Sequence, residues 1–236
     1  MWDNAALLRN IANALMAFSA CAVLYGTAYY VMHLPGLFPL QSVRLSAAPQ
    51  RVDAPEVLQA VRNGVDGNFF TVDIERLRAA LEQLPWVRSV NIRREFPNRL
   101  AVELEEHQPL ARWNNAALVN RQGEVFVAET AQVLPDFIGQ EDYSQEVAQH
   151  YAQFSDQLAA LNLQVVQLAQ SPRHAWQLHL SNGMVLELGS EDMQRRLDRF
   201  VAVYPYSLAG MQSSVKHVDL RYRNGFAVQL SYGDAA

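Results

Sequence analysis

An uncharged stretch near the N-terminus limits where this chain can reside. No Asp, Glu, Lys or Arg occurs between Arg9 and Arg44, and residues 11–32 are mostly Ala, Leu, Val, Tyr, Phe and Met. A bilayer core of ~30 Å needs ~20 helical residues, so the run is long enough to cross a membrane. We therefore predict a transmembrane anchor helix over residues 11–33, preceded by a short tail of residues 1–10.

The charges that flank this stretch predict its orientation. Arg9 precedes it, whereas no Lys or Arg follows it until Arg44. The positive-inside rule then places the N-terminal tail in the cytoplasm and the C-terminal bulk of the chain outside. Tyr29 and Tyr30 fall near the outer end, where aromatic rings favour the membrane interface.

Three other interpretations of the stretch are weaker. A cleaved signal peptide has an apolar core of ~7–15 residues and a small-residue cleavage site, whereas this run is longer and shows no clean site before Tyr29. Residues 18–21 loosely resemble a lipoprotein acylation site, but the chain stays apolar from Ala22 to Met32, unlike a polar tether. A buried helix of a soluble domain fits poorly with the terminal position and the asymmetric flanks. An uncleaved anchor is the favoured interpretation.

The overall composition is that of a globular protein with an acidic balance. Hydrophobic residues make up 50% and charged residues 18% of the 236 residues, which suits one or two ordinary domains. The net charge of -5 argues against nucleic acid as the main partner, because phosphate binding needs a basic surface. Cys21 is the only cysteine, so no intramolecular disulfide can form.

Strand and helix signals follow one another after the anchor. Asp53, Pro55 and Glu56 mark a helix start, and Phe69 and Phe70 are expected to pack a loop onto the core. Two helices on one face of a small antiparallel or mixed sheet would give an α+β layer. The predicted order is strand, helix, helix, strand, strand, over residues 41–45, 53–62, 73–84, 86–96 and 100–105.

This order, directly after an anchor, resembles a POTRA domain. The local residues are more specific, because GNFFTVD at 67–73, LPWV at 84–87 and VNIRREFPNRL at 90–100 resemble the POTRA domains of the bacterial FtsQ/DivIB cell-division family. The continuation over residues 102–113 resembles the link of that family to its second domain. The resemblance implies a POTRA domain over residues 40–109.

From residue 117 onward, short strand signals surround two predicted helices. Asn182 and Gly183 predict a hairpin turn, and residues 134–139 predict a loop with buried apolar side chains. The helices are predicted over residues 147–161 and 191–204. The strands are predicted over residues 118–120, 124–127, 163–168, 176–180, 184–188, 216–222 and 226–232.

This second region also resembles the C-terminal β domain of the FtsQ/DivIB family. Gln229 and Leu230 depart from the resemblance, because a more aromatic end to the final strand is expected there. The matching residues are 176–178, 189, 195–197, 199–201, 204–205 and 218–225. The predicted fold class is α+β, with an N-terminal transmembrane helix, a POTRA domain (β-α-α-β-β), then a mixed β domain with flanking helices at residues 110–232 and a tail at 233–236.

No pattern in the chain indicates a catalytic site, a cofactor or a metal. The six histidines form no His-Glu-x-x-His motif, and no cysteine accompanies them as a metal ligand. Ser213 and Lys216 match the Ser-x-x-Lys signature of penicillin-binding proteins. Because Lys216 is the only lysine, the Lys-Thr-Gly motif that should accompany this signature cannot exist.

Three arginines gather around the second and third predicted strands, namely Arg93, Arg94 and Arg99. Glutamates interleave with them at positions 95, 103 and 105. Such mixing of charge is typical of a solvated sheet face.

The resemblance implies a non-enzymatic scaffold of the cell-division machinery (divisome). Members of this family join early and late division proteins at the septum and regulate septal peptidoglycan synthesis without catalysing it. They bind the bitopic proteins FtsB and FtsL through the β domain, and the DNA translocase FtsK through the anchor and POTRA region. The resemblance also implies a bacterial inner membrane, with the N-terminus cytoplasmic and the C-terminal domain periplasmic.

We expect the last strands to bind FtsB by strand addition. An edge strand offers unpaired N–H and C=O groups, and side-chain pockets set specificity. Tyr222 and Phe226 are candidate aromatic anchors, and Arg221 or Arg223 is the candidate cation for an acidic partner. The less favoured alternative is that Tyr222 is a core aromatic. The candidate surface is His217, Asp219, Arg221, Tyr222, Arg223, Asn224, Gly225 and Phe226, with Phe200 and Tyr204 from the preceding helix.

Two functions from other classes compete with the scaffold. POTRA domains also precede transmembrane β-barrels, so a POTRA-containing component of envelope secretion or assembly is an alternative. The remaining ~125 residues hold predicted helices and lack the repeated ~10-residue strands of a barrel. A membrane-anchored periplasmic enzyme would need convergent carboxylates or histidines, which the sequence does not show.

Overall fold

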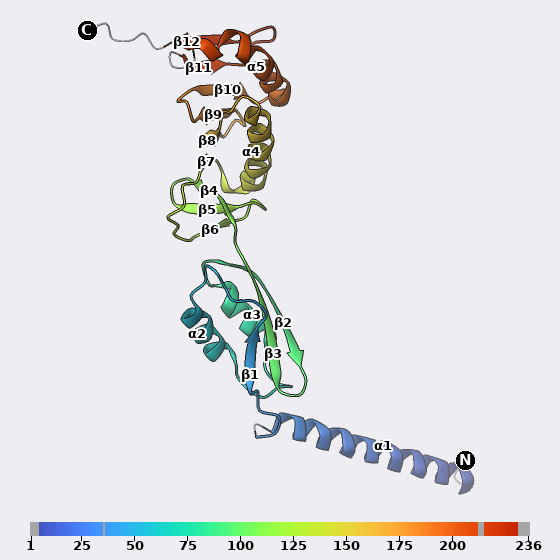
Figure 1. The fold of residues 1–236 in the computed structure, drawn as a ribbon. Coiled ribbons are helices and arrows are strands. Elements are labelled where there is room, and N and C mark those ends of the chain that lie inside the picture. Colours follow the sequence, from blue (N-terminus) through green and yellow to red (C-terminus); the bar gives the residue numbers. More distant parts are fainter. Residues whose placement is uncertain (1–4, 35, 212–214, 231–236) are drawn as a thin grey trace. The chain divides into compact units, whose positions relative to one another are not determined.

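A computed structural model describes residues 5–34, 36–211 and 215–230 of the chain (Figure 1). The chain divides into two compact units, Met1–Glu106 and His107–Ala236. The first unit holds a long helix and a small mixed sheet, and the second holds a large sheet with two helices. The α+β prediction is confirmed.

The N-terminal helix α1, Ala5–His33, has 29 residues, and every one of its side chains is exposed. At ~1.5 Å per residue its length is about 44 Å. Its length and apolar composition allow it to cross a membrane. The predicted helix is confirmed, and it begins several residues earlier than expected because residues 5–10 are also helical.

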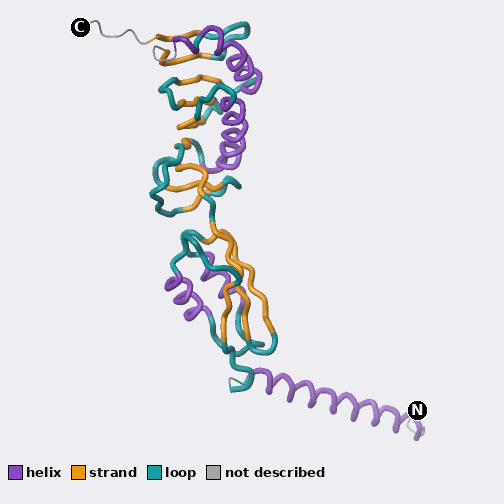
Figure 2. Tube along the Cα trace, in the orientation of Figure 1, coloured by secondary structure: helices purple, strands orange, loops and turns teal. Residues whose placement is uncertain are grey.

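The predicted POTRA order is confirmed in the first unit. Strand β1 pairs parallel with β3, and β2 pairs antiparallel with β3, so the three-stranded sheet is mixed and has the order β1-β3-β2. Two helices lie against this sheet (Figure 2). The elements are β1 (Ser42–Leu45), α2 (Ala54–Gly64), α3 (Ile74–Glu82), β2 (Val87–Glu95) and β3 (Arg99–Glu106).

The core of this sheet is built from alternate strand residues and one stripe of each helix. Leu100 and Val102 of β3 are fully buried, and they meet Leu77 and Leu81 of α3 in one cluster. The two helices approach closely at Gly64, where an added Cβ would lie 2.9 Å from Leu77 Cδ1. Apolar residues repeat about every 3.6 positions in the helices and every 2 in the strands, and both sets pack into one apolar layer.

The second unit is a nine-stranded sheet in the order β12-β11-β10-β9-β8-β7-β4-β5-β6. Its α-helices are α4 (Ser144–Ala159) and α5 (Met193–Ser207), and short 3-10 helices run over Glu141–Tyr143 and Ala209–Met211. The strands are β4 (Pro109–Trp113), β5 (Ala117–Asn120), β6 (Val125–Phe126), β7 (Asp136–Ile138), β8 (Val165–Gln170), β9 (Trp176–Leu180), β10 (Val185–Gly189), β11 (Val215–Asp219) and β12 (Ala227–Leu230).

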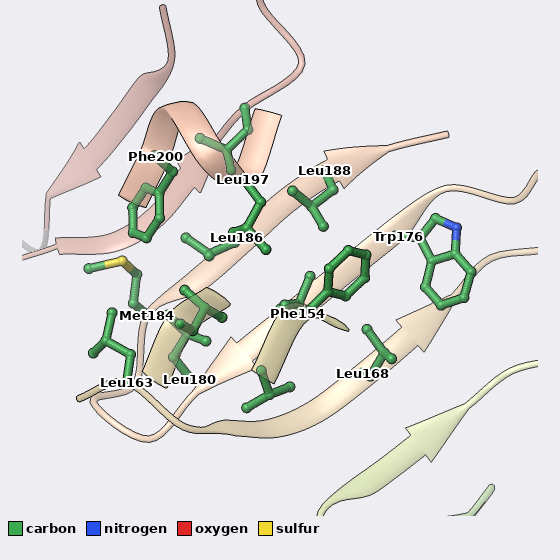
Figure 3. Packing of buried hydrophobic residues seen from close by; sticks show 14 of the residues in the cluster. Phe154, Leu163, Leu168, Trp176, Leu180, Met184, Leu186, Leu188, Leu197 and Phe200 are labelled. Carbon is green, nitrogen blue, oxygen red and sulfur yellow. The ribbon is translucent and has the colours of Figure 1, made fainter. Parts of the chain in front are cut away.

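Both helices of the second unit lie along the same side of its sheet (Figures 1 and 2). Leu186 and Leu188 of β10 point toward Leu197 and Phe200 of α5, as Figure 3 shows. Phe154 of α4 extends the same cluster over β8 and β9, and all five side chains are fully buried. This layer fixes α5 against the C-terminal strands that carry the candidate site.

Several elements of the second unit differ from the predictions, among them β4, because no strand was predicted over residues 109–113. Residues 134–139 were expected to form a loop, but β7 runs parallel between β4 and β8. A three-residue strand is too short to show alternation, so only its neighbours reveal it. Helix α5 was expected to end at Tyr204, but it continues past Pro205 to Ser207.

Candidate partner-binding edge

Strand β12 forms one end of the nine-stranded sheet. It pairs antiparallel with β11, with Val218 opposite Val228 and Asp219 opposite Ala227. Among the residues that the structure describes, β11 is its only neighbour, and all four of its residues are exposed. Its outer side therefore presents unpaired main-chain groups to an incoming strand.

The opposite end of the sheet, β6, is a poorer template. It comprises only Val125 and Phe126, which pair with Val119 and Leu118 of β5. Phe126 is buried, and its ring stacks on the His107 ring with a centroid separation of 4.0 Å. The longer and more exposed strand β12 is therefore the better candidate for strand addition.

A compact loop joins β11 to β12, and an ion pair closes its base. Arg221 donates from its backbone N to Asp219 Oδ1 at 3.0 Å, from Nε to Oδ1 at 2.9 Å and from Nη2 to Oδ2 at 2.6 Å. These hydrogen bonds from Arg221 hold the pKa of Asp219 below its usual range. The sequence left open whether Arg221 or Arg223 faces an acidic partner, and the intrachain pair already engages Arg221.

Arg199 of α5 fixes the next part of the loop. Its Nη2 donates to the carbonyl oxygens of Leu220 at 3.2 Å and Tyr222 at 2.8 Å, and its Nη1 donates to the carbonyl of Arg223. The backbone of three loop residues is thereby tied to the helix. Tyr222 keeps 58% of its surface exposed, so the alternative that it is a core aromatic does not apply.

The prediction that two residues of the preceding helix form part of the surface needs correcting. Phe200 is fully buried and Tyr204 retains only 4% of its exposure, because both lie on the stripe of α5 that faces the sheet. Both residues belong to the core that packs beneath the loop, and neither is part of the exposed surface. The exposed tyrosine of this helix is Tyr206, at 92%. Phe226 is half-buried, with its ring centroid 6.3 Å from that of Phe200.

The remaining predicted residues lie along the same corner. His217 is half-buried in β11, with Nε2 3.9 Å from Glu187 Oε2. Asn224 is exposed and Gly225 is half-buried in the loop. The loop from Tyr222 to Ala227 lines an open hollow of about 480 Å³. The structure thus brings the predicted strand and loop residues to one corner of the sheet.

No catalytic or metal-binding constellation emerges over the described ranges. No three His, Cys, Asp or Glu side chains there are placed to hold a metal ion. Ser213 of the Ser-x-x-Lys match, and the predicted end of the last strand at residues 231–232, lie outside the described residues.

Comparison with known families matches both units. The family described as POTRA domain, FtsQ-type, matches residues 38–107. The family described as cell division protein FtsQ/DivIB, C-terminal, matches residues 111–221. The two matches together cover most of the chain beyond α1.

Three curated relatives match the chain over nearly its whole length, and each carries the name cell division protein FtsQ. The protein of Nitrosospira multiformis is 39% identical, over 97% of this chain and 99% of its own. That of Burkholderia pseudomallei is 38% identical, over 98% and 95%. That of Bordetella pertussis is 36% identical, over 98% and 93%.

Proposed function

This chain belongs to the FtsQ/DivIB family of cell division proteins, and on that premise we propose that it is a non-enzymatic scaffold of the division machinery. Its β domain binds the bitopic proteins FtsB and FtsL, and its anchor and POTRA region binds FtsK. Helix α1 crosses the inner membrane once, with the N-terminus in the cytoplasm and the two folded domains in the periplasm at the septum. The chain thereby links early and late division proteins and regulates septal peptidoglycan synthesis.

The observation that carries this proposal is the exposed terminal strand β12 beside the exposed Tyr222. A segment of FtsB adds a tenth strand along β12, where main-chain hydrogen bonds supply register and part of the affinity. Val228 and Leu230 point to one side of β12 and are 36% and 42% exposed, so they offer a short apolar strip to the added strand.

The loop supplies the specificity. Tyr222 is a rigid aromatic held by a fixed backbone, the type of residue that dominates interface energetics. Arg223 is exposed, and its guanidinium forms no ion pair with any described residue. Since Arg221 is engaged by Asp219, we assign the contact with an acidic partner residue to Arg223.

The first test is binding of the FtsB periplasmic segment to the full chain in nanodiscs. Tyr222→Ala is expected to weaken binding about 30-fold, since truncating an aromatic hot spot costs ~2 kcal/mol. Tyr206→Ala is the matched control, because it removes another exposed tyrosine of the same unit. Equal affinities for Tyr222→Ala and the wild type would place the partner elsewhere.

The second test is directed at the added strand itself. Gln229→Cys, in a Cys21→Ser background, places a single thiol on β12 and should form a disulfide with a cysteine introduced into the bound FtsB segment. Val133→Cys, fully exposed elsewhere in the same unit, is the control and should not cross-link. Cross-linking that is equal at both positions would contradict strand addition at β12.

A further inference from the structure

Hydrogen bonds join the end of α1 and the segment that follows it to the POTRA domain. The side chain of Asn68, only 1% exposed, donates from Nδ2 to the carbonyl oxygens of Met32 at 2.7 Å and Leu34 at 3.2 Å. The backbone N of Phe69 donates to the carbonyl of Phe38 at 3.0 Å. The loop of residues 67–72 therefore contacts the point where the chain leaves the anchor helix.

A row of aromatic rings starts at this point and crosses the end of the domain. The ring of Phe38 lies 5.1 Å from that of Phe70, Phe70 lies 5.1 Å from Phe69, and Phe69 lies 6.4 Å from Phe96. Phe69 is buried, whereas Phe38, Phe70 and Phe96 are 42%, 36% and 78% exposed. Leu37 adds a further exposed apolar side chain. We call Leu37, Phe38, Phe70 and Phe96 the exit patch.

Arg94 satisfies the backbone polar groups beneath the exit patch. Its Nε donates to the carbonyl of Phe69 at 2.9 Å, and its Nη2 donates to those of Phe70 at 3.4 Å and Val72 at 2.9 Å. Moving a carbonyl group that lacks a hydrogen bond into an apolar environment costs free energy, so these hydrogen bonds lower that cost. The loop thus presents hydrophobic rings outward while its own polar groups face the protein.

Three arginines lie on the open face of the same sheet, toward the end where Phe96 follows β2. The register places Arg44 and Arg93 on either side of Ala101, and Arg99 opposite Glu95 two rows closer to the end of the sheet. At ~4.8 Å between strands, the Cα atoms of Arg44 and Arg93 lie roughly 10 Å apart. The side chains of Arg44, Arg93 and Arg99 are exposed and form no ion pair with residues in the described part of the chain.

Two glutamates of this face lie farther from the anchor, whereas Glu95 lies at the anchor end opposite Arg99. Glu103 and Glu105 follow along β3, two and four residues beyond Ala101, and Glu105 is engaged by Arg88 at 2.6 Å and Ser89 at 2.9 Å. Strand pairing therefore separates in space the arginines and most of the glutamates that alternate in the sequence. The cations gather at the anchor end, where Glu95 is the only acidic neighbour in register.

We propose that the exit patch, with Arg44, Arg93 and Arg99, is a second membrane contact that binds anionic phospholipid headgroups. Aromatic rings favour the interface between hydrocarbon and water, and basic clusters beside a membrane helix attract anionic lipids. The POTRA domain is then held on the leaflet surface by one end and does not swing freely on its anchor. This inference rests on the proposal that α1 crosses the bilayer.

Chain connectivity favours lipid as the occupant. Leu37 lies four residues after His33, the last residue of α1, so even an extended chain keeps it within about 14 Å of the helix end. Polar headgroup layers extend roughly 5–8 Å on each side of the hydrocarbon core. If α1 spans the core, the exit patch is confined to the headgroup region or directly above it.

The test measures membrane depth with a nitroxide label on the full chain in nanodiscs that contain phosphatidylglycerol. Phe96→Cys in a Cys21→Ser background carries the label at the exit patch. Gln83→Cys is the control, since it is exposed and caps α3 before the start of β2, whereas Phe96 follows the end of that nine-residue strand. We expect the label at position 96 to collide with oxygen in the lipid and to be shielded from an aqueous nickel reagent, and the label at 83 to behave in the opposite way.

The arginines are tested by a pair of matched double variants. Arg44→Glu with Arg93→Glu should reduce the lipid-bound population about fivefold for each arginine that leaves the headgroups. Arg62→Glu with Arg76→Glu changes the net charge equally on exposed helix positions and should leave the depth unchanged. Equal effects of the two pairs, or equal depth in pure phosphatidylcholine, would overturn the assignment of anionic headgroups.

A label on the native Cys21 separates this inference from the proposed function. Cys21 lies in α1, so it should be deep in the bilayer if the anchor spans it. A deep Cys21 with a fully aqueous position 96 would overturn the second membrane contact and leave the anchor in place. An aqueous Cys21 would overturn the membrane topology, and the second contact with it.

Discussion

Replacing Arg199 by alanine tests how far the candidate site depends on the helix behind it. Three loop carbonyls, of Leu220, Tyr222 and Arg223, would lose their donor. A hydrogen bond to a charged group contributes ~1.5–3 kcal/mol when buried, but only Leu220 is buried, and the other two carbonyls can turn to water. We expect the β domain to lose about 2–3 kcal/mol of unfolding free energy in total.

Urea unfolding followed by tryptophan fluorescence measures this loss. Trp113 and Trp176 are both buried in the core of the second unit, so they report on it directly. With a slope of ~1–3 kcal/mol per molar urea, the midpoint should fall by about 1 M. Arg195→Ala is the control, because Arg195 is exposed on the same helix and should leave the midpoint unchanged.

Partner binding should fall in the same variant although Tyr222 is untouched. Reordering even one released loop residue costs ~1–2 kcal/mol, so affinity for the FtsB segment should drop about tenfold. In a Tyr222→Ala background the same Arg199→Ala change should cost much less, because the side chain that the loop positions is gone. An unchanged midpoint, or fully additive losses of affinity, would refute the idea that Arg199 positions Tyr222.

Two further predictions concern the POTRA domain. Burial works to raise the pKa of Glu106, but hydrogen bonds from the backbone N atoms of Arg51, Val52 and Gln50 outweigh it and hold that pKa below its ordinary value of 4.5. Its contribution to stability is therefore present above about pH 4.5 and is lost as the pH falls through the lowered value, so Glu106→Gln should destabilise the domain at neutral pH and flatten its acid unfolding curve. Gly64→Ala would bring a methyl group 3.2 Å from Leu77 Cα and should cost ~1–3 kcal/mol in thermal or urea unfolding, whereas Gly210→Ala, in open space, should be neutral.

The helices and most strands could be predicted because their periods are visible within a short window. Leu77 and Leu81 form one stripe of α3, and β9 occupies the predicted residues 176–180. β7 could not be predicted in this way. Its three residues become a strand only because β4 and β8 flank them, and those neighbours are distant in the sequence.

The position of the candidate site in the chain could be predicted, but which of its residues are buried and which are exposed could not. The spacing of Phe200 and Tyr204 places them on one stripe of α5. The same spacing is expected whether that stripe packs against the sheet or binds a partner. The basic cluster shows the same limit. Arg44 and Arg93 are far apart in the chain, and only the pairing of both β1 and β2 with β3 brings them to either side of Ala101.

The unequal ends of the nine-stranded sheet also constrain self-association. An open filament needs two different, complementary surfaces on each copy, whereas a surface that meets its own copy closes into a two-fold dimer. As far as the described residues define the sheet, only β12 offers a usable ladder, since β6 has two residues and a buried ring. Pairing along β12 would therefore add one segment or close two copies into a two-fold pair, and a filament would need a second ladder that the described residues of β6 do not supply.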